Sequence, residues 1–139
     1  MAERVFVDTN VFIYADDNSA PAKRERARDV LRELVQGGRA VVSTQVLQEF
    51  FVVATRKLGI PADRARRRLE ALAHLDVVLI RPELILGAVD LHRLSSVSFW
   101  DALVIRCASA AGCARLLSED LQHGQVIDGV RIENPFLGP

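Results

Sequence analysis

The sequence has too few cysteines for a disulfide framework or a cysteine-based zinc site. Its two cysteines, Cys107 and Cys113, match no metal-binding spacing such as CxxC. Because an unpaired cysteine behaves as a small hydrophobic side chain, we expect both thiols to be free and buried. This usage excludes small disulfide-rich folds and indicates a reducing setting.

The sequence also lacks any apolar run of the roughly 18 residues that a transmembrane helix needs. It starts with a short apolar strand and not with a basic segment followed by an apolar signal region. We therefore expect no membrane segment and a soluble, cytoplasmic protein.

An excess of charge of either sign is absent as well. The chain has 139 residues, with 18 Lys and Arg against 18 Asp and Glu, so the net charge is zero. This balance argues against binding nucleic acid through bulk charge, although it permits local basic patches. Half of the residues are hydrophobic, which is enough to bury a sizeable core. We expect residues 1–139 to form a single domain.

Apolar patterns predict strands that alternate with helices. Helical spacing marks the helices, and Gly or Pro marks several of their ends. The predicted strands cover residues 4–8, 40–43, 76–80, 114–120 and 130–136, and the predicted helices cover residues 22–38, 44–59, 61–75, 82–95 and 98–112. Such alternation is typical of the α/β class, so we expect a short central parallel sheet of four to five strands with helices on both faces.

Two acidic residues follow predicted strands, at the end where open parallel sheets form their sites. Asp8 ends the apolar strand "RVFVD", where desolvation of a carboxylate is costly. A turn or a helix N-cap would also explain it, since Asp-Thr-Asn suits both. Asp120 follows the fourth strand, where a turn carboxylate is the structural alternative. Glu119 competes with Asp120, because alternation along a strand sends only one of the two toward a given face.

Two further acids lie near the starts of predicted helices. Asp101 interrupts an apolar sector of its helix, although a capping box with Ser98 would also explain it. Glu49 lies at the edge of an apolar helix face, where a boundary glutamate is also common. A parallel sheet can gather all four acids at one edge. Close carboxylates repel one another unless a cation neutralises them, and oxygen ligands suit a hard divalent ion such as Mg²⁺ or Mn²⁺.

Four segments carry a resemblance to a known family. They are, in order along the chain, "VFVDTNVFIY", "STQVLQEFF", "FWDALVIRCASAAGCARLLSED" and "GVRIENPF". In sequence and spacing they resemble the PIN-domain family of metal-dependent ribonucleases, and within it the compact VapC-type toxins. The resemblance covers essentially the whole chain and implies the same fold.

The resemblance also implies a set of site residues and a reaction. The acidic positions of the family fall on Asp8, Glu49, Asp101 and Asp120, with supporting polar positions at Asn10 and Ser118. It implies cleavage of single-stranded or loop RNA with Mg²⁺ or Mn²⁺, in which metal-bound water attacks phosphorus in line and leaves a 5′-phosphate and a 3′-hydroxyl. Asp8 and Asp101 would be the central metal ligands. Glu49 would bind the ion or orient the water, and Asp120 would complete the site.

Partners follow from the same resemblance. The resembling toxins form homodimers, and an antitoxin segment covers their active-site groove, so we expect both kinds of partner here. An RNA-processing nuclease and a non-catalytic binding module of the same fold stay open as alternatives. A haloacid-dehalogenase-like phosphatase is disfavoured, because Asn10 stands where such an enzyme needs a second aspartate.

Basic and aromatic residues supply candidates for RNA contact. The predicted third and fourth helices carry a basic cluster, in which the candidates for binding RNA phosphates are Arg56, Lys57, Arg64, Arg67 and Arg68. A solvated helix face would explain the same cluster. Trp100 precedes Asp101, and we expect it to pack in the core or in an interface, although its ring could also stack on a base.

Overall fold

Six short strands form one sheet at the centre of the molecule. The computed structural model describes residues 3–137, and the strands lie in the order β3-β2-β1-β4-β6-β5. All hydrogen-bonded pairs are parallel except β5 with β6. The strand bounds are β1 Val5–Val7, β2 Ala40–Ser43, β3 Asp76–Val78, β4 Arg115–Leu117, β5 Val126–Ile127 and β6 Val130–Glu133.

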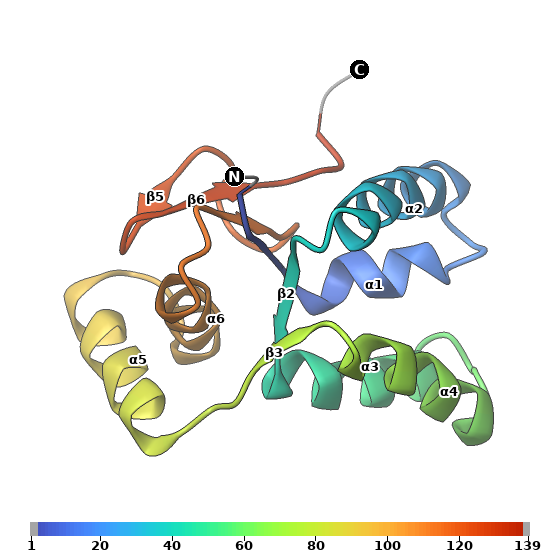
Figure 1. Ribbon diagram of the computed structural model, residues 1–139, viewed down its shortest axis with the longest axis horizontal. Coiled ribbons are helices and arrows are strands. Elements are labelled where there is room, and N and C mark those ends of the chain that lie inside the picture. The colour runs from blue at the N-terminus through green and yellow to red at the C-terminus, as the bar shows by residue number, and fades with distance from the viewer. Residues whose placement is uncertain (1–2, 138–139) are drawn as a thin grey trace.

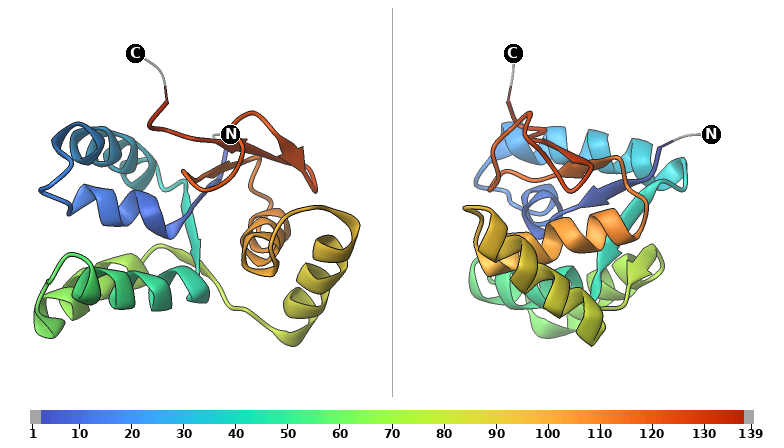
Figure 2. Two further views of the ribbon diagram at one scale, coloured as in Figure 1. Left: turned by 180° about the vertical axis from the view of Figure 1, so that it is seen from behind. Right: turned by 90° about the vertical axis from the view of Figure 1, so that its left-hand side faces the viewer.

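Helices cover both faces of this sheet. Figure 1 shows α1 to α4 on one side and α5 with α6 on the other, and the view from behind in Figure 2 agrees. The helix bounds are α1 Thr9–Ala15, α2 Pro21–Gln36, α3 Thr44–Arg56, α4 Ala62–Ala73, α5 Pro82–Leu94 and α6 Phe99–Ala110. This architecture confirms the predicted α/β class. None of these helices is both long enough and apolar enough to cross a membrane.

The centre of the core is β1, whose three residues are completely buried. A strand with parallel neighbours on both edges and helices on both faces has no solvated side, so its sequence is apolar throughout. The two cysteines pack into the same core, and both are free and buried, as predicted.

Polar caps start the helices that follow the inner strands. Asp8 caps α1 and accepts a hydrogen bond from the backbone of Thr9. Ser43 caps α3, and Ser98 caps α6, where it accepts from the backbone of Asp101. Each cap satisfies a first-turn N–H that has no partner within its helix. The structure therefore confirms the helix-cap explanation for Asp8 and the Ser98 half of the capping box considered for Asp101.

The structure departs from the sequence prediction in three places. Helix α1 was not predicted, because its run of apolar residues follows a strand directly and has no polar face to reveal a period. Strand β4 ends at Leu117, so residues 118–120 lie in a loop and not in the strand. A sixth strand, β5, adds an antiparallel edge to the four or five parallel strands that were expected.

The β5–β6 hairpin turns on two residues with positive φ. Asp128 has a φ of 52° and Gly129 a φ of 76°, as a two-residue type I′ turn requires. Arg106 of α6 donates to Oδ2 of Asp128 at 2.9 Å, and the Ser109 hydroxyl donates to its carbonyl oxygen at 3.0 Å. The hairpin is thus attached to the helix that carries Asp101.

Replacement of Gly129 should destabilise this hairpin. No atom lies within 4 Å of a Cβ built on Gly129, so Gly129→Ala adds backbone strain without a clash. We expect the free energy of unfolding to fall by about 1 kcal/mol, measured by urea unfolding. Asp128→Asn should cost less, because Asn adopts positive φ and can still accept from Arg106. An equal loss in both variants would show that the ion pair, and not the turn backbone, stabilises the hairpin.

Candidate functional site

The carboxyl-terminal edge of the sheet is the expected position for a ligand site. From β1 the chain moves outward to β2 and β3, and then returns to β4 on the other side of β1. In open parallel sheets, ligands bind at the carboxyl ends of the strands beside such a switch point. Asp8 follows β1 directly, and Ser118 follows β4, so both lie at this position.

Asp8 is a buried carboxylate held by two hydrogen bonds. It is 7% exposed. Its Oδ1 accepts from the backbone N of Thr9, and its Oδ2 accepts from the Ser118 hydroxyl, each at 2.8 Å. Burial raises the pKa of Asp8 to about 6, although both hydrogen bonds lower it. Repulsion from Glu49 and Asp120 adds to the rise.

Asn10 and Ser118 organise the loop that follows β4. The Asn10 amide donates to Oδ2 of Asp120 at 3.1 Å, and its Oδ1 accepts from the backbone N of Glu119 at 3.2 Å. Oγ of Ser118 accepts from the backbone N of Asp120 at 3.1 Å while its hydroxyl donates to Asp8. The two residues predicted as supporting therefore connect the first acid with the last.

Glu119 and Asp120 have different partners. The Tyr14 hydroxyl donates to Oε1 of Glu119 at 2.8 Å, and the Lys23 ammonium donates to Oε2 at 2.6 Å. Burial alone would raise the pKa of Glu119, but these two hydrogen bonds outweigh it and lower the pKa. Lys23 thus compensates the charge of Glu119, whereas Asp120 contacts the amide of Asn10.

Glu49 and Asp101 are the acids contributed by helices. Burial raises the pKa of Glu49, and a hydrogen bond from Gln45 opposes the rise. Repulsion from Asp120 and Asp101 raises it further. Burial likewise raises the pKa of Asp101. Hydrogen bonding with Ser98 lowers this pKa, and repulsion from Asp120 raises it further. Each helical acid therefore lies within the electrostatic reach of the loop acid.

The four predicted acids lack a compensating cation. Within residues 3–137, no Lys or Arg forms an ion pair with any of the four. Glu49 and Asp120 line a hollow of about 240 Å³ in which Lys57 is the one basic lining residue. Such a set of unpaired carboxylates is unusual for a purely structural feature, because each one is repelled by the others.

The donor set suits a hard divalent cation. As the side chains are placed, no three His, Cys, Asp or Glu residues within the described part of the chain are close enough to hold one ion. The available donors are nevertheless carboxylate oxygens with the Asn10 amide nearby, which hard cations prefer. Glu49 and Asp120 are exposed and can approach an ion by changing rotamer. A bound cation would also relieve the repulsion that the acids exert on one another.

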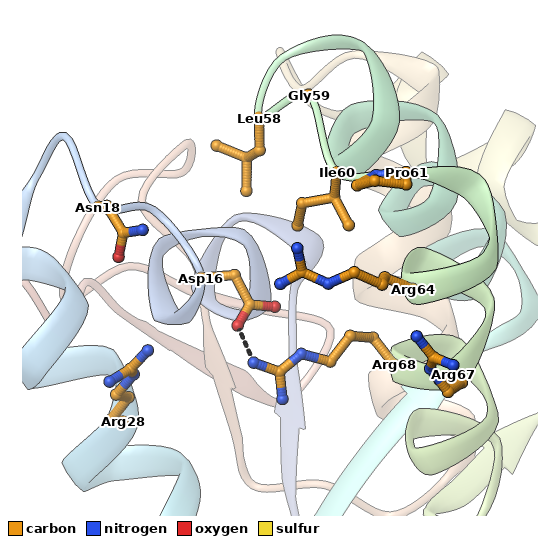
Figure 3. A pocket seen from close by; sticks show the side chains of 10 residues that line it. All are labelled: Asp16, Asn18, Arg28, Leu58, Gly59, Ile60, Pro61, Arg64, Arg67 and Arg68. Carbon is orange, nitrogen blue, oxygen red and sulfur yellow. Dashed lines mark hydrogen bonds and ion pairs between the residues drawn. The ribbon is translucent and has the colours of Figure 1, made fainter.

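The predicted basic cluster divides between two places. Lys57 lines the acidic hollow. Arg64, Arg67 and Arg68 line a separate pocket of about 490 Å³. Figure 3 shows Arg64 and Arg68 reaching from α4 toward Asp16, with Arg28 of α2 across the pocket.

Arginines outnumber acids in this second pocket, so it carries a net positive charge. Arg68 pairs with Asp16, the one acidic lining residue. Arg67 makes only a long contact with Asp63, at 3.8 Å. Arg64 forms no ion pair with any residue in the range 3–137. The fifth predicted basic residue, Arg56, is exposed and lines neither hollow.

A family model matches most of the chain. The PIN domain model aligns with residues 5–127, a span that includes all four acids and both supporting residues. Among the curated proteins, none matches the sequence.

Several solved structures share the fold at low sequence identity. A toxin–antitoxin complex from Klebsiella pneumoniae is 19% identical, with 94% of this chain and 97% of that chain covered and a TM-score of 0.71. The sarcin–ricin loop cleaving toxin VapC20 of Mycobacterium tuberculosis is 22% identical, with 81% and 86% covered and a TM-score of 0.60. VapBC2 from Rickettsia felis, bound to a promoter DNA fragment, is 16% identical, with 94% and 97% covered and a TM-score of 0.66.

Removal of the buried charge should stabilise the metal-free protein. The pKa of Asp8 is about 6 in the fold against 3.8 as its ordinary value, so its ionised form opposes folding. This penalty is absent below pH 3.8, grows up to pH 6 and then stays constant, at no more than about 3 kcal/mol. Asp8→Asn should therefore unfold at higher urea concentration than wild type at pH 7 in EDTA, with the gap closing by pH 4.

Excess Mn²⁺ supplies the control for this measurement. An ion that binds the acids of the native protein stabilises the wild type, whereas the variant offers it one ligand fewer. Mn²⁺ should therefore narrow or reverse the difference in the urea concentration of unfolding between the two proteins at pH 7. A difference between the two proteins that does not change with pH would contradict the buried ionised carboxylate.

Proposed function

Because the chain belongs to the PIN domain family, we propose that it is a metal-dependent endoribonuclease that hydrolyses phosphodiester bonds in single-stranded or loop RNA. The observation that carries this proposal is the group of four carboxylates beside the carboxyl ends of β1 and β4, none of which has a basic ion-pair partner within residues 3–137. The fold shared with a toxin described as cleaving the sarcin–ricin loop supports the choice of RNA.

Nucleases of this family generally use divalent metal ions, and we propose Mg²⁺ or Mn²⁺ for this site. The residues that would hold the ion are Asp8, Glu49, Asp101 and Asp120. A divalent ion supplies a water of lowered pKa and offsets negative charge on a phosphoryl oxygen.

The side chains of the site have separate tasks in this proposal. Ser118 and the α1 backbone fix the Asp8 carboxylate before any ligand arrives. Asn10 donates to Asp120 and keeps it beside the site, from where a change of rotamer can bring it to the ion. Glu49 is accessible to solvent, and partial desolvation together with repulsion from Asp120 and Asp101 raises its pKa. It is therefore suited to orient the attacking water and take up its proton.

Basic residues are assigned to the RNA backbone. Lys57 lies in the acidic hollow, where its ammonium can pair with a phosphate that the carboxylates would otherwise repel. The arginine pocket, lined by Arg64, Arg67 and Arg68, offers further phosphate contacts, and Arg56 is exposed on the same helix as Glu49. Such contacts give affinity that is blind to sequence.

We further propose that the protein is the toxin of a toxin–antitoxin pair and forms a homodimer in the cytoplasm. The toxin–antitoxin complexes among its structural neighbours support an antitoxin partner. Free buried thiols agree with a reducing compartment.

RNA cleavage tests the proposed function directly. A pool of structured and single-stranded RNAs should be cut by the wild type with Mg²⁺ or Mn²⁺ and not with EDTA. Asp8→Asn and Asp101→Asn should each reduce the rate on the order of 100-fold or more, because each removes a ligand of the ion. The readout is the pattern and rate of end-labelled fragments.

Three variants control this assay. Asp90→Asn removes an exposed acid of α5, outside the site, and should cleave at the wild-type rate. Asp120→Asn should lose far more activity than Glu119→Gln, because Lys23 and Tyr14 already hold Glu119. Folded wild-type protein that neither cleaves RNA with any metal nor binds Mn²⁺ would overturn the proposal and favour a non-catalytic binding module.

The arginine pocket predicts a change in salt dependence. The double variant Arg64→Gln, Arg67→Gln should bind single-stranded RNAs of all sequences more weakly and to a similar degree. The slope of log K against log salt should become shallower by about 0.7 for each phosphate that the variant no longer neutralises. Arg66→Gln is the matched control, because Arg66 lies on the same helix but pairs with Glu70 and does not line the pocket. An equal loss in the control would show that only general charge matters.

A further inference from the structure

Another hollow, distinct from the arginine pocket, adjoins the acidic hollow, and aromatic and amide groups form most of its walls. It measures about 360 Å³ and is lined by Gln45, Gln48, Glu49 and Trp100. This volume lies within the range of small-molecule sites. This hollow therefore shares Glu49 with the acidic hollow, and Asp101 is the next residue in sequence after Trp100.

Trp100 does not pack in the core, which was one of the two positions expected for it from the sequence, the other being an interface. Its residue surface is 63% exposed. The ring packs edge-on against Phe99, with centroids 5.1 Å apart and planes at 75°. Exposure of a large aromatic ring to water is energetically unfavourable, and tryptophan is enriched at surfaces that bind a partner.

Gln45 contributes a mostly buried amide side chain to the lining of the same hollow. Its residue surface is only 7% exposed, and its Oε1 has no hydrogen-bond partner. A buried carbonyl oxygen without a donor is rare in folded proteins. A rotation of the Gln45 side chain toward the hollow would let this oxygen accept from a ligand that carries an N–H group.

We propose that this hollow holds one nucleobase of the RNA substrate, stacked on Trp100 and donating an N–H to Oε1 of Gln45. The inference rests on the proposed nuclease function, and it adds the part of the substrate that the acids do not contact. Glu49 forms one wall and no Lys or Arg lines the hollow, so a phosphate is repelled there. A base has the flat face and the N–H edge that these walls require.

The position of the hollow assigns this base to a nucleotide beside the bond that is cut. Glu49 contributes to both hollows, and Asp101 follows Trp100 in the sequence. The exposed amide of Gln48 adds a second donor and acceptor at the rim. The bound base would thereby position the scissile phosphate before the acids, and Trp100 acts as a positioning and specificity residue.

Fluorescence provides the first test, because Trp100 is the only tryptophan of the chain. The Asp8→Asn variant, which should bind RNA without cutting it, is titrated with single-stranded oligoribonucleotides and with abasic sugar–phosphate chains of equal length. We expect quenching by the oligoribonucleotides only, and an affinity for them at least roughly 5-fold higher. Binding of the abasic chains is followed by the anisotropy of an attached dye.

Variants of the hollow provide the second test. Trp100→Ala should raise KM for RNA at least roughly 5-fold, whereas Trp100→Phe should restore most of the loss because it keeps a stacking face. Val52→Ala removes another exposed apolar side chain, from α3, and should leave KM unchanged. Gln45→Leu should reduce discrimination between an adenine base and a purine base that lacks the exocyclic amine. Circular dichroism and thermal melting check that each variant is folded.

The outcomes separate this inference from the function on which it rests. Quenching by bases without metal-dependent cleavage by the wild type would contradict the nuclease but keep the base site. Cleavage with equal quenching by abasic chains would contradict the base site alone. A tryptophan signal that shifts with protein concentration in the absence of RNA would also overturn it, because a second copy of the chain would then cover the ring.

Discussion

The hydrogen bond from the Ser118 hydroxyl to the Asp8 carboxylate is the contact on which the site depends. It joins the carboxyl ends of β1 and β4, which are 110 positions apart in the sequence but adjacent in the sheet. The other oxygen of Asp8 caps α1, so one side chain fixes two strands and a helix. Burial of Asp8 opposes its ionisation. The fold therefore contains a carboxylate whose negative charge only a bound cation can fully stabilise.

A net charge of zero conceals two opposite electrostatic environments. Asp8, Glu49, Asp101 and Asp120 have no basic ion-pair partner within residues 3–137, whereas arginines outnumber acids in the pocket between α2 and α4. The two environments meet at the end of α3. Lys57 lines the acidic hollow, and the next residue, Leu58, lines the arginine pocket. A polyanion approaching the acids therefore meets repulsion at the reacting centre and attraction beside it. In the proposed nuclease, a bound cation would reverse the charge at the acids and so allow a phosphate to approach them.

The sequence was informative where the physical constraint is local. A carboxylate that directly follows an apolar strand reveals itself by its desolvation cost, and this signal located Asp8. Helical periodicity gave Trp100 a direction on α6 but not the neighbours that would cover it, so its exposure could not be predicted. The β5 strand has only two residues, too few for an alternating pattern. The Asp128-Gly129 pair between apolar residues was the available signal for this hairpin, and it depends on turn geometry rather than on periodicity.

The choice between Glu119 and Asp120 shows why long-range contacts limit such predictions. The spacing from Ser118 favoured Asp120, and alternation along a strand allowed only one of the two acids to face the site, but β4 ends at Leu117 and neither acid lies in a strand. Instead, partners from distant helices separate the two acids. Lys23 of α2 compensates Glu119, and Asn10 of α1 donates to the side chain of Asp120 while accepting from the backbone between them. Both partners lie more than 90 positions away in the sequence, so the roles of two neighbouring acids are decided by the tertiary fold and not by their own segment.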